Sequence, residues 1–150
     1  MTTDNIAHIP FTPTPRDFPG FAMPPSVPAG MRLELSRARI ISGKEPEFDQ
    51  WMNMLNSRPE ELQEGLPSER VVFEATFQNV EADGSTWLYH LTLRGEDSEG
   101  LDETIPIDAE HAAYSRSVKE PGWEELEPKF MLTPFHLLDG MQRWAASGKP

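Results

Sequence analysis

The sequence predicts an α+β protein whose core elements follow the order β-α-β-β-α-β. Three observations predict it: a strong hairpin signal over residues 70–94, helical spacing of apolar residues on both sides of that hairpin, and a strand-like run near each end. This order is the ferredoxin-like arrangement, with an antiparallel sheet and both helices on one face. Because the other face would stay open, we expect a second copy to cover it and form a dimeric α+β barrel.

The central element is the hairpin, whose two runs are rich in β-branched and aromatic residues around Ala82-Asp83-Gly84. A three-residue loop puts Gly84 at the position with positive φ, a conformation that glycine tolerates. The resulting register fixes the two faces, since side chains alternate along a strand. The polar face carries Glu74 and His90, and the other face carries Phe73, Ala75, Phe77, Trp87, Tyr89, Leu91 and Leu93.

The segment before the hairpin predicts one strand and two helices. Residues 31–41 read as a strand, and residues 44–56 predict a helix because their apolar side chains recur at helical spacing. Ser57 and Glu60 form a capping box that starts a second helix, which Pro67 ends.

The segment after the hairpin opens with an acidic loop over residues 95–106. Asp108 is the predicted cap of a helix from Ala109 to Lys119. Residues 126–133 predict a short edge strand. The Thr-Pro pair at 133–134 then starts an extra C-terminal helix with an apolar face.

Residues 1–30 form a proline-rich N-terminal arm in front of a single domain over residues 31–150. The arm holds seven of the 15 prolines, which exclude a helix or a central strand. Its side chains Phe11, Phe18 and Phe21 would not be needed in a solvated linker. Plain disorder is one interpretation and docking on the body or a partner is the other; the area that phenylalanine can bury leads us to expect docking.

Composition narrows the classes of function. The 150 residues include no cysteine, which excludes a disulfide framework, a thiolate nucleophile and a cysteine-based metal centre. The net charge of −12 disfavours nucleic acid as a partner. No apolar run approaches the ~20 residues of a membrane span, and the N-terminus lacks signal-peptide features. We therefore expect a cytoplasmic protein that binds neither nucleic acid nor membrane.

Five motifs over residues 31–145 allow a comparison with known families. They are Ser36-Arg37-x-Arg39, Gly43-Lys44-Glu45 with Trp51-Met52, Glu74 three before Phe77, Trp87-Leu88-Tyr89, and His111-x-x-Tyr114. In this pattern the chain resembles an uncharacterised bacterial family, domain of unknown function 6176, which often has Trp where this chain has Ser115. The resemblance names no activity. It implies the dimeric α+β-barrel architecture, shared by cofactor-free monooxygenases, heme-degrading enzymes, sugar mutarotases and small cyclases.

One candidate site centres on the second helix. His111 and Tyr114 lie one turn apart on the stripe that should face the sheet, where Trp87 and Tyr89 would oppose them. Together the four would line an aromatic pocket for a small organic molecule. His111 would act as general acid–base and Tyr114 as hydrogen-bond donor. A hydrogen-bonded core histidine and ordinary core aromatics are the structural alternatives.

A second candidate is the pair Glu74 and His90, in which the carboxylate would orient or charge the imidazole. A solvated or interface ion pair is the alternative. Arg37 and Arg39 would bind an acidic part of a ligand, or else pair with surface acids. The spacing of Glu74, His90 and His111 fits no metal motif, so we expect neither metal nor cofactor.

These features predict a homodimer that binds a small organic molecule. We expect a cofactor-free enzyme that moves protons, of isomerase, cyclase or monooxygenase type. One alternative is a non-catalytic ligand-binding or assembly protein whose arm engages a partner. Another is a heme-binding barrel that uses His111 and Trp87, although no asparagine on the first strand completes such a site.

Overall fold

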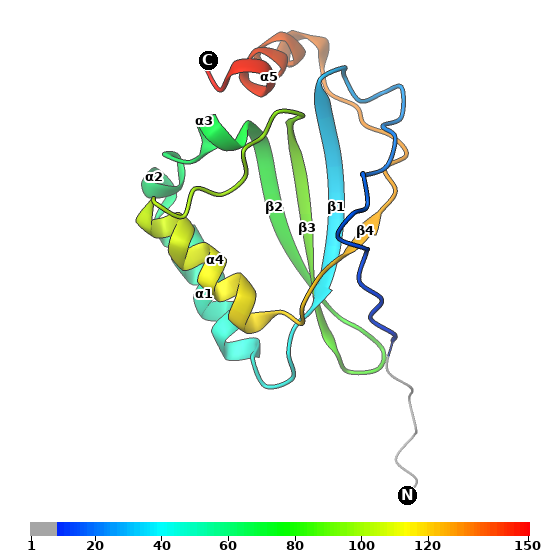
Figure 1. Cartoon of the computed structure of the whole chain (residues 1–150), viewed down its shortest axis with the longest axis vertical. Coiled ribbons are helices and arrows are strands. Elements are labelled where there is room, and N and C mark those ends of the chain that lie inside the picture. The colour runs from blue at the N-terminus through cyan, green and yellow to red at the C-terminus, as the bar shows by residue number, and fades with distance from the viewer. Residues whose placement is uncertain (1–8) are drawn as a thin grey trace, which may run out of the picture.

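The structure, a computed structural model, describes residues 9–150, so the first eight residues of the predicted arm lie outside it. Its four strands form one antiparallel sheet in the order β2-β3-β1-β4 (Figure 1). The strands are β1 (Met31–Arg39), β2 (Val71–Val80), β3 (Thr86–Gly95) and β4 (Glu124–Leu126). With one long helix after β1 and another after β3, this is the ferredoxin-like fold that the sequence predicts.

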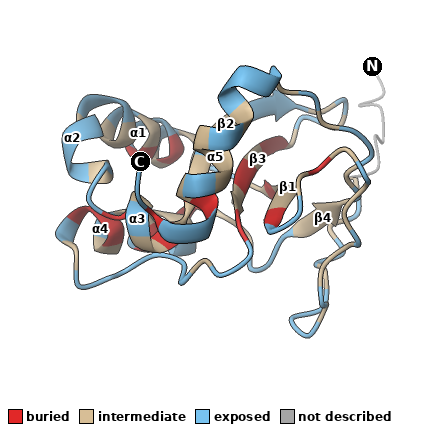
Figure 2. Cartoon of the chain, turned by 90° about the horizontal axis from the view of Figure 1, so that it is seen from above, coloured by how far each residue is buried: buried red, intermediate tan, exposed pale blue. Residues whose placement is uncertain are grey.

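Two long helices, α1 (Glu45–Ser57) and α4 (Pro106–Val118), cover one face of the sheet (Figure 1). The short helices α2 (Pro59–Leu62) and α3 (Leu66–Glu69) lead from α1 into β2, and α5 (Phe135–Ser147) lies across one end of the sheet. Figure 2 shows buried residues on β1, β3 and the sheet-facing sides of α1 and α4. No helix within residues 9–150 is long and apolar enough to cross a membrane.

The hairpin has the predicted three-residue loop. Val80 pairs with Thr86, the Glu81 N–H donates to the Ser85 carbonyl at 2.8 Å, and Gly84 has φ +83°. The predicted register of both faces is therefore confirmed.

The polar face of the hairpin is the one that the helices cover. Leu88 packs with Ala38, Phe48 and Trp51 in the core between sheet and helices. Because side chains alternate along a strand, Trp87 must point to the opposite, outer face. The prediction that Trp87 and Tyr89 line a pocket with the helix stripe is therefore wrong.

The described part of the arm docks on the outer face and along β4 (Figure 1). The Phe11 ring meets the Trp87 ring edge-on, with centroids 5.6 Å apart. Next to β4, the Thr14 N–H donates a hydrogen bond to the carbonyl of Trp123 at 2.7 Å. Val27 is buried with Met31, Leu93 and Ala145 in a second core. Phe18 and Phe21 pack against each other with centroids 4.9 Å apart.

Several predicted boundaries are wrong, and proline explains three of them. Helix α4 begins at Pro106, which suits a first turn because it needs no N–H there, so Asp108 lies inside the helix instead of capping it. Pairing of β4 stops at Leu126, before Pro128, which has no N–H for a ladder. Pro67 likewise lies in the first turn of α3 instead of ending a helix.

The capping box at the second helix also does not form. Ser57 is the last residue of α1, and Arg58 takes the N-cap position of α2 without a side-chain cap. The predicted helix is instead split between the short α2 and α3.

Candidate functional site

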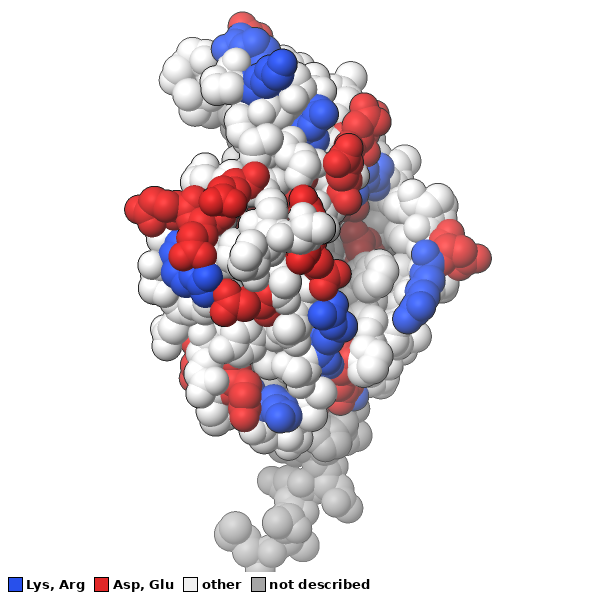
Figure 3. All heavy atoms as spheres, turned by 60° about the vertical axis from the view of Figure 1, so that its left-hand side comes forward, with Lys and Arg blue, Asp and Glu red and all other residues white. Residues whose placement is uncertain are grey.

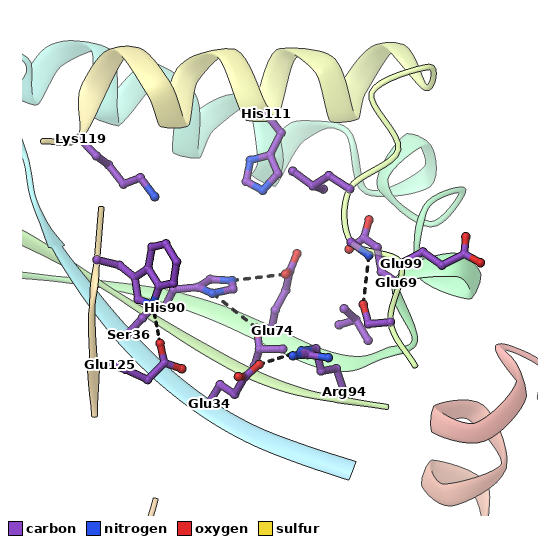
Figure 4. Close-up of a pocket in the computed structure, with 16 residues that line it drawn as sticks. Glu34, Ser36, Glu69, Glu74, His90, Arg94, Glu99, His111, Lys119 and Glu125 are labelled. Carbon is purple, nitrogen blue, oxygen red and sulfur yellow. Dashed lines mark hydrogen bonds and ion pairs between the residues drawn. The ribbon is translucent and has the colours of Figure 1, made fainter. Parts of the chain in front are cut away.

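A polar cleft of about 660 Å³ opens between α4 and the helix-facing side of the sheet (Figure 4). Five carboxylate side chains line it, from Glu34, Glu69, Glu74, Glu99 and Glu125. The cations in the lining are Arg94, whose Nε donates to Glu34 Oε1 at 2.7 Å, and Lys119. Figure 3 shows acidic side chains gathered on this side of the molecule, some of them in a hollow.

A second cleft of about 470 Å³, between α1, α2 and β2, is more apolar. Its apolar lining includes Met52, Leu55, Leu62 and Leu66. Both clefts share Val71, Glu74, His90 and His111 in their linings. The two candidate constellations of the sequence thus form one site, where a polar and an apolar space meet.

Glu74 on β2 and His90 on β3 are partners across the two strands. Glu74 Oε2 lies 3.3 Å from His90 Nε2, and each side chain is 38% exposed. This hydrogen bond lowers the pKa of Glu74, and desolvation by burial partly opposes that effect. Because an ionised carboxylate only accepts, His90 must carry its proton on Nε2, and its Nδ1 lies 3.5 Å from Thr92 Oγ1.

His111 points from α4 toward the sheet, facing Glu74 and His90 (Figure 4). Buried Trp51 donates its indole N–H to His111 Nδ1 at 2.7 Å. An indole nitrogen can only donate, so this bond assigns a lone pair to Nδ1 and the proton to Nε2. Burial lowers the pKa of His111, an effect that Glu74 opposes and that His90 and Lys119 reinforce. Both effects favour the neutral imidazole of His111, with its N–H at Nε2.

The other predicted site residues lie elsewhere. The Tyr114 ring stacks on Trp51 with centroids 6.4 Å apart, and it does not line either cleft. On the outer face, the Tyr89 hydroxyl donates to Glu81 Oε1 at 2.8 Å. Because Trp87 shares that face, it cannot join His111 in the predicted heme site.

Arg37 and Arg39 also occupy the outer face of β1, away from both clefts. Arg37 Nε donates to Glu124 Oε2 at 2.8 Å, and Arg39 Nε donates to Glu120 Oε2 at 3.0 Å. Pairing with neighbouring acids, the alternative from the sequence, is what the structure shows.

The sequence did not predict that two carboxyl groups at this site, those of Glu69 and Asp108, are buried. Glu69 is 7% exposed, and burial, with the charges of Glu74 and Asp108, raises its pKa to about 8. Asp108 is 1% exposed, its pKa is raised by burial, and its Oδ2 has no hydrogen-bond partner within the described chain. Both groups pack against Gly65, where an added Cβ would lie 2.7 Å from Asp108 Oδ2 and 2.7 Å from Glu69 Oε1.

Nowhere in residues 9–150 do three or more His, Cys, Asp or Glu side chains form a group that could hold a metal ion.

Fold and cleft together define a small α+β protein of ferredoxin-like fold, with titratable side chains between sheet and helices. The chain belongs to a family of unknown function, DUF6176, whose model matches residues 31–138. This match confirms the family that the motifs indicate, and the matched range includes every residue that lines the two clefts. A search among curated proteins found no match.

Proposed function

We propose that the protein binds an uncharged carbonyl compound in the cleft and moves a proton on the carbon next to the carbonyl. The supporting observation is the convergence of Glu74, His90 and His111, from β2, β3 and α4, where the polar and apolar clefts meet. Pairs of titratable groups held in different protonation states are the usual equipment for such proton transfer.

The two imidazoles would take opposite roles. Trp51 occupies Nδ1 of His111, so His111 would donate its Nε2–H to the carbonyl oxygen and stabilise the negative charge that develops there. Glu74 occupies Nε2 of His90, so His90 would accept the proton at its other ring nitrogen, Nδ1. His111 is thus proposed as a hydrogen-bond donor, in place of the general acid–base role expected from the sequence.

The test is proton exchange into cyclohexanone in heavy water, followed by proton NMR. We expect the wild-type protein to speed loss of the signal next to the carbonyl, and His90→Asn and Glu74→Gln to reduce that rate at least ~10-fold. His136→Asn is the matched control because His136 is exposed on α5, away from the cleft. Equal rates for His90→Asn and wild type would refute the proposal.

Exposed aromatic residues favour the homodimer as a second part of this proposal. On the outer face of β2, the side chains of Phe73 and Phe77 are 43% and 56% exposed. An exposed apolar patch on a protein surface often marks an interface. Since the arm covers the Trp87 end, a second copy would pack on the β2 side. Sedimentation should show a dimer that Phe77→Glu dissociates; a wild-type monomer at micromolar concentration would contradict this. Cytoplasmic location and bacterial origin stay predictions of the sequence.

A further inference from the structure

The amine of Lys119 lies in the same cleft and has no side-chain partner among residues 9–150. Its side chain reaches from the end of α4 into the space that His111 and His90 face (Figure 4). Although the lining is rich in carboxylates, Lys119 makes no ion pair or side-chain hydrogen bond with any residue in the described part of the chain. Lys44 and Lys149 also make no ion pair within residues 9–150, but Lys119 differs from them in lying inside a cleft lined by five carboxylates.

The backbone holds this lysine between the two layers of the fold. Lys119 is the C-cap residue of α4, and its N–H donates to the Ser115 carbonyl at 3.4 Å. It also forms an antiparallel bridge with Ile40, directly after β1, while the Glu120 N–H donates to the Arg39 carbonyl at 2.8 Å. The base of the side chain is therefore fixed relative to the sheet and the helix at once.

The surroundings of the amine select a class of ligand. The carboxylates of the lining repel an anion, which argues against a phosphate or carboxylate anchor at Lys119. Burial lowers the pKa of Lys119, so more of it is the neutral, nucleophilic amine than in an exposed lysine. An uncharged aldehyde or ketone suits both conditions, and an apolar substituent would fit beside Met52 and Leu55 in the adjoining cleft.

We propose that Lys119 condenses with the carbonyl carbon of an uncharged aldehyde or ketone in the cleft to form an imine. This deepens the proposed function and rests on it. Lys119 Nζ would attack the carbonyl carbon, and a proton shifts from nitrogen to the oxygen, which His111 hydrogen-bonds. The carbon–oxygen bond then breaks, and the oxygen takes up a proton from solvent in the open cleft and leaves as water. A protonated imine remains, and His90 would remove a proton from the adjacent carbon to give the enamine.

The test uses cyclohexanone and sodium cyanoborohydride with the full chain at pH 7, followed by peptide mass spectrometry. The hydride reduces an imine to a stable cyclohexyl amine. We expect at least ~5-fold more adduct on Lys119 than on Lys44, Lys129 or Lys149. Lys44 is the matched internal control because it too is half-buried. Lys119→Arg should remove the main adduct without increasing labelling of the other lysines.

Two results would overturn the inference. One is adduct spread evenly over the lysines, and the other is preferential labelling of Lys119 by pyruvate, an anionic ketone that the acidic lining should exclude. Failure here is distinguishable from failure of the proposed function. If labelling is even but proton exchange into cyclohexanone still depends on His90, the proposed function stands without the imine. If Lys119 is labelled but exchange does not depend on His90, the imine stands without the proposed proton transfer.

Discussion

The buried carboxyl of Glu69 predicts a pH dependence of stability that Glu69→Gln should remove. Its pKa is raised from 4.5 to about 8 in the folded chain. Between these values the folded state binds more protons than the unfolded state, so stability falls as pH rises. Each pKa unit corresponds to about 1.4 kcal/mol, and the wild type should therefore lose about 3 kcal/mol between pH 5 and pH 8 relative to the variant.

Urea unfolding followed by tryptophan fluorescence at pH 5, 6, 7 and 8 measures this difference. The two proteins should have similar unfolding free energies at pH 5, and the variant should be increasingly more stable toward pH 8. Glu99→Gln is the matched control, because Glu99 lines the same cleft but is exposed. Parallel pH profiles for wild type and Glu69→Gln would refute the reasoning, since they would mean that Glu69 titrates alike in both states.

Three further predictions concern the packing around the site and the arm. Trp51→Phe removes the donor to His111 Nδ1, so the pKa of His111 should rise in an NMR titration, with a loss of ~1 kcal/mol in unfolding free energy. Gly65→Ala would place a Cβ 2.7 Å from two carboxyl oxygens, so it should lower the melting temperature, whereas Gly140→Ala, with its nearest neighbour at 3.8 Å, should not. Phe11→Ala should lower the unfolding free energy by ~1–2 kcal/mol. It should also expose the Trp87 side chain to solvent, which tryptophan fluorescence would detect.

Each of these has a contradicting outcome. An unchanged His111 titration in Trp51→Phe would mean that the indole does not hold the tautomer. Equal melting temperatures for the two alanine variants would mean that the carboxyls move aside freely. Phe135→Ala, at a side chain 89% exposed, is the control for the arm, and the same effect from both phenylalanine variants would contradict docking at Trp87.

The hairpin register was predictable because it depends on local chemistry. Gly84 in a three-residue loop fixes which residues oppose each other, and with them the neighbouring placement of Glu74 and His90. The helical stripe that carries His111 was predictable for the same reason, since its spacing is a local property of the chain.

The choice of sheet face was not predictable in this way. The aromatic face with Trp87 looks like the core-facing side, but the arm, distant in sequence, covers it, and Leu88 faces the helices instead. Glu69 and Asp108 were missed because charged residues are rarely buried without a partner, and no pattern in the sequence marks them. The bond between Trp51 and His111 joins residues 60 positions apart, so only the folded chain brings them together.

The most direct test of the site is an NMR titration of isotope-labelled histidine nitrogens with cyclohexanone. At pH 8, His90 and His111 should both carry the proton on Nε2, since Glu74 accepts from the first and Trp51 donates to Nδ1 of the second. Added cyclohexanone should shift Nδ1 of His90 and Nε2 of His111, the two nitrogens proposed to act on the ligand, and leave exposed His136 unchanged. A proton on His111 Nδ1, or signals of His90 and His111 that do not respond to cyclohexanone, would contradict the account.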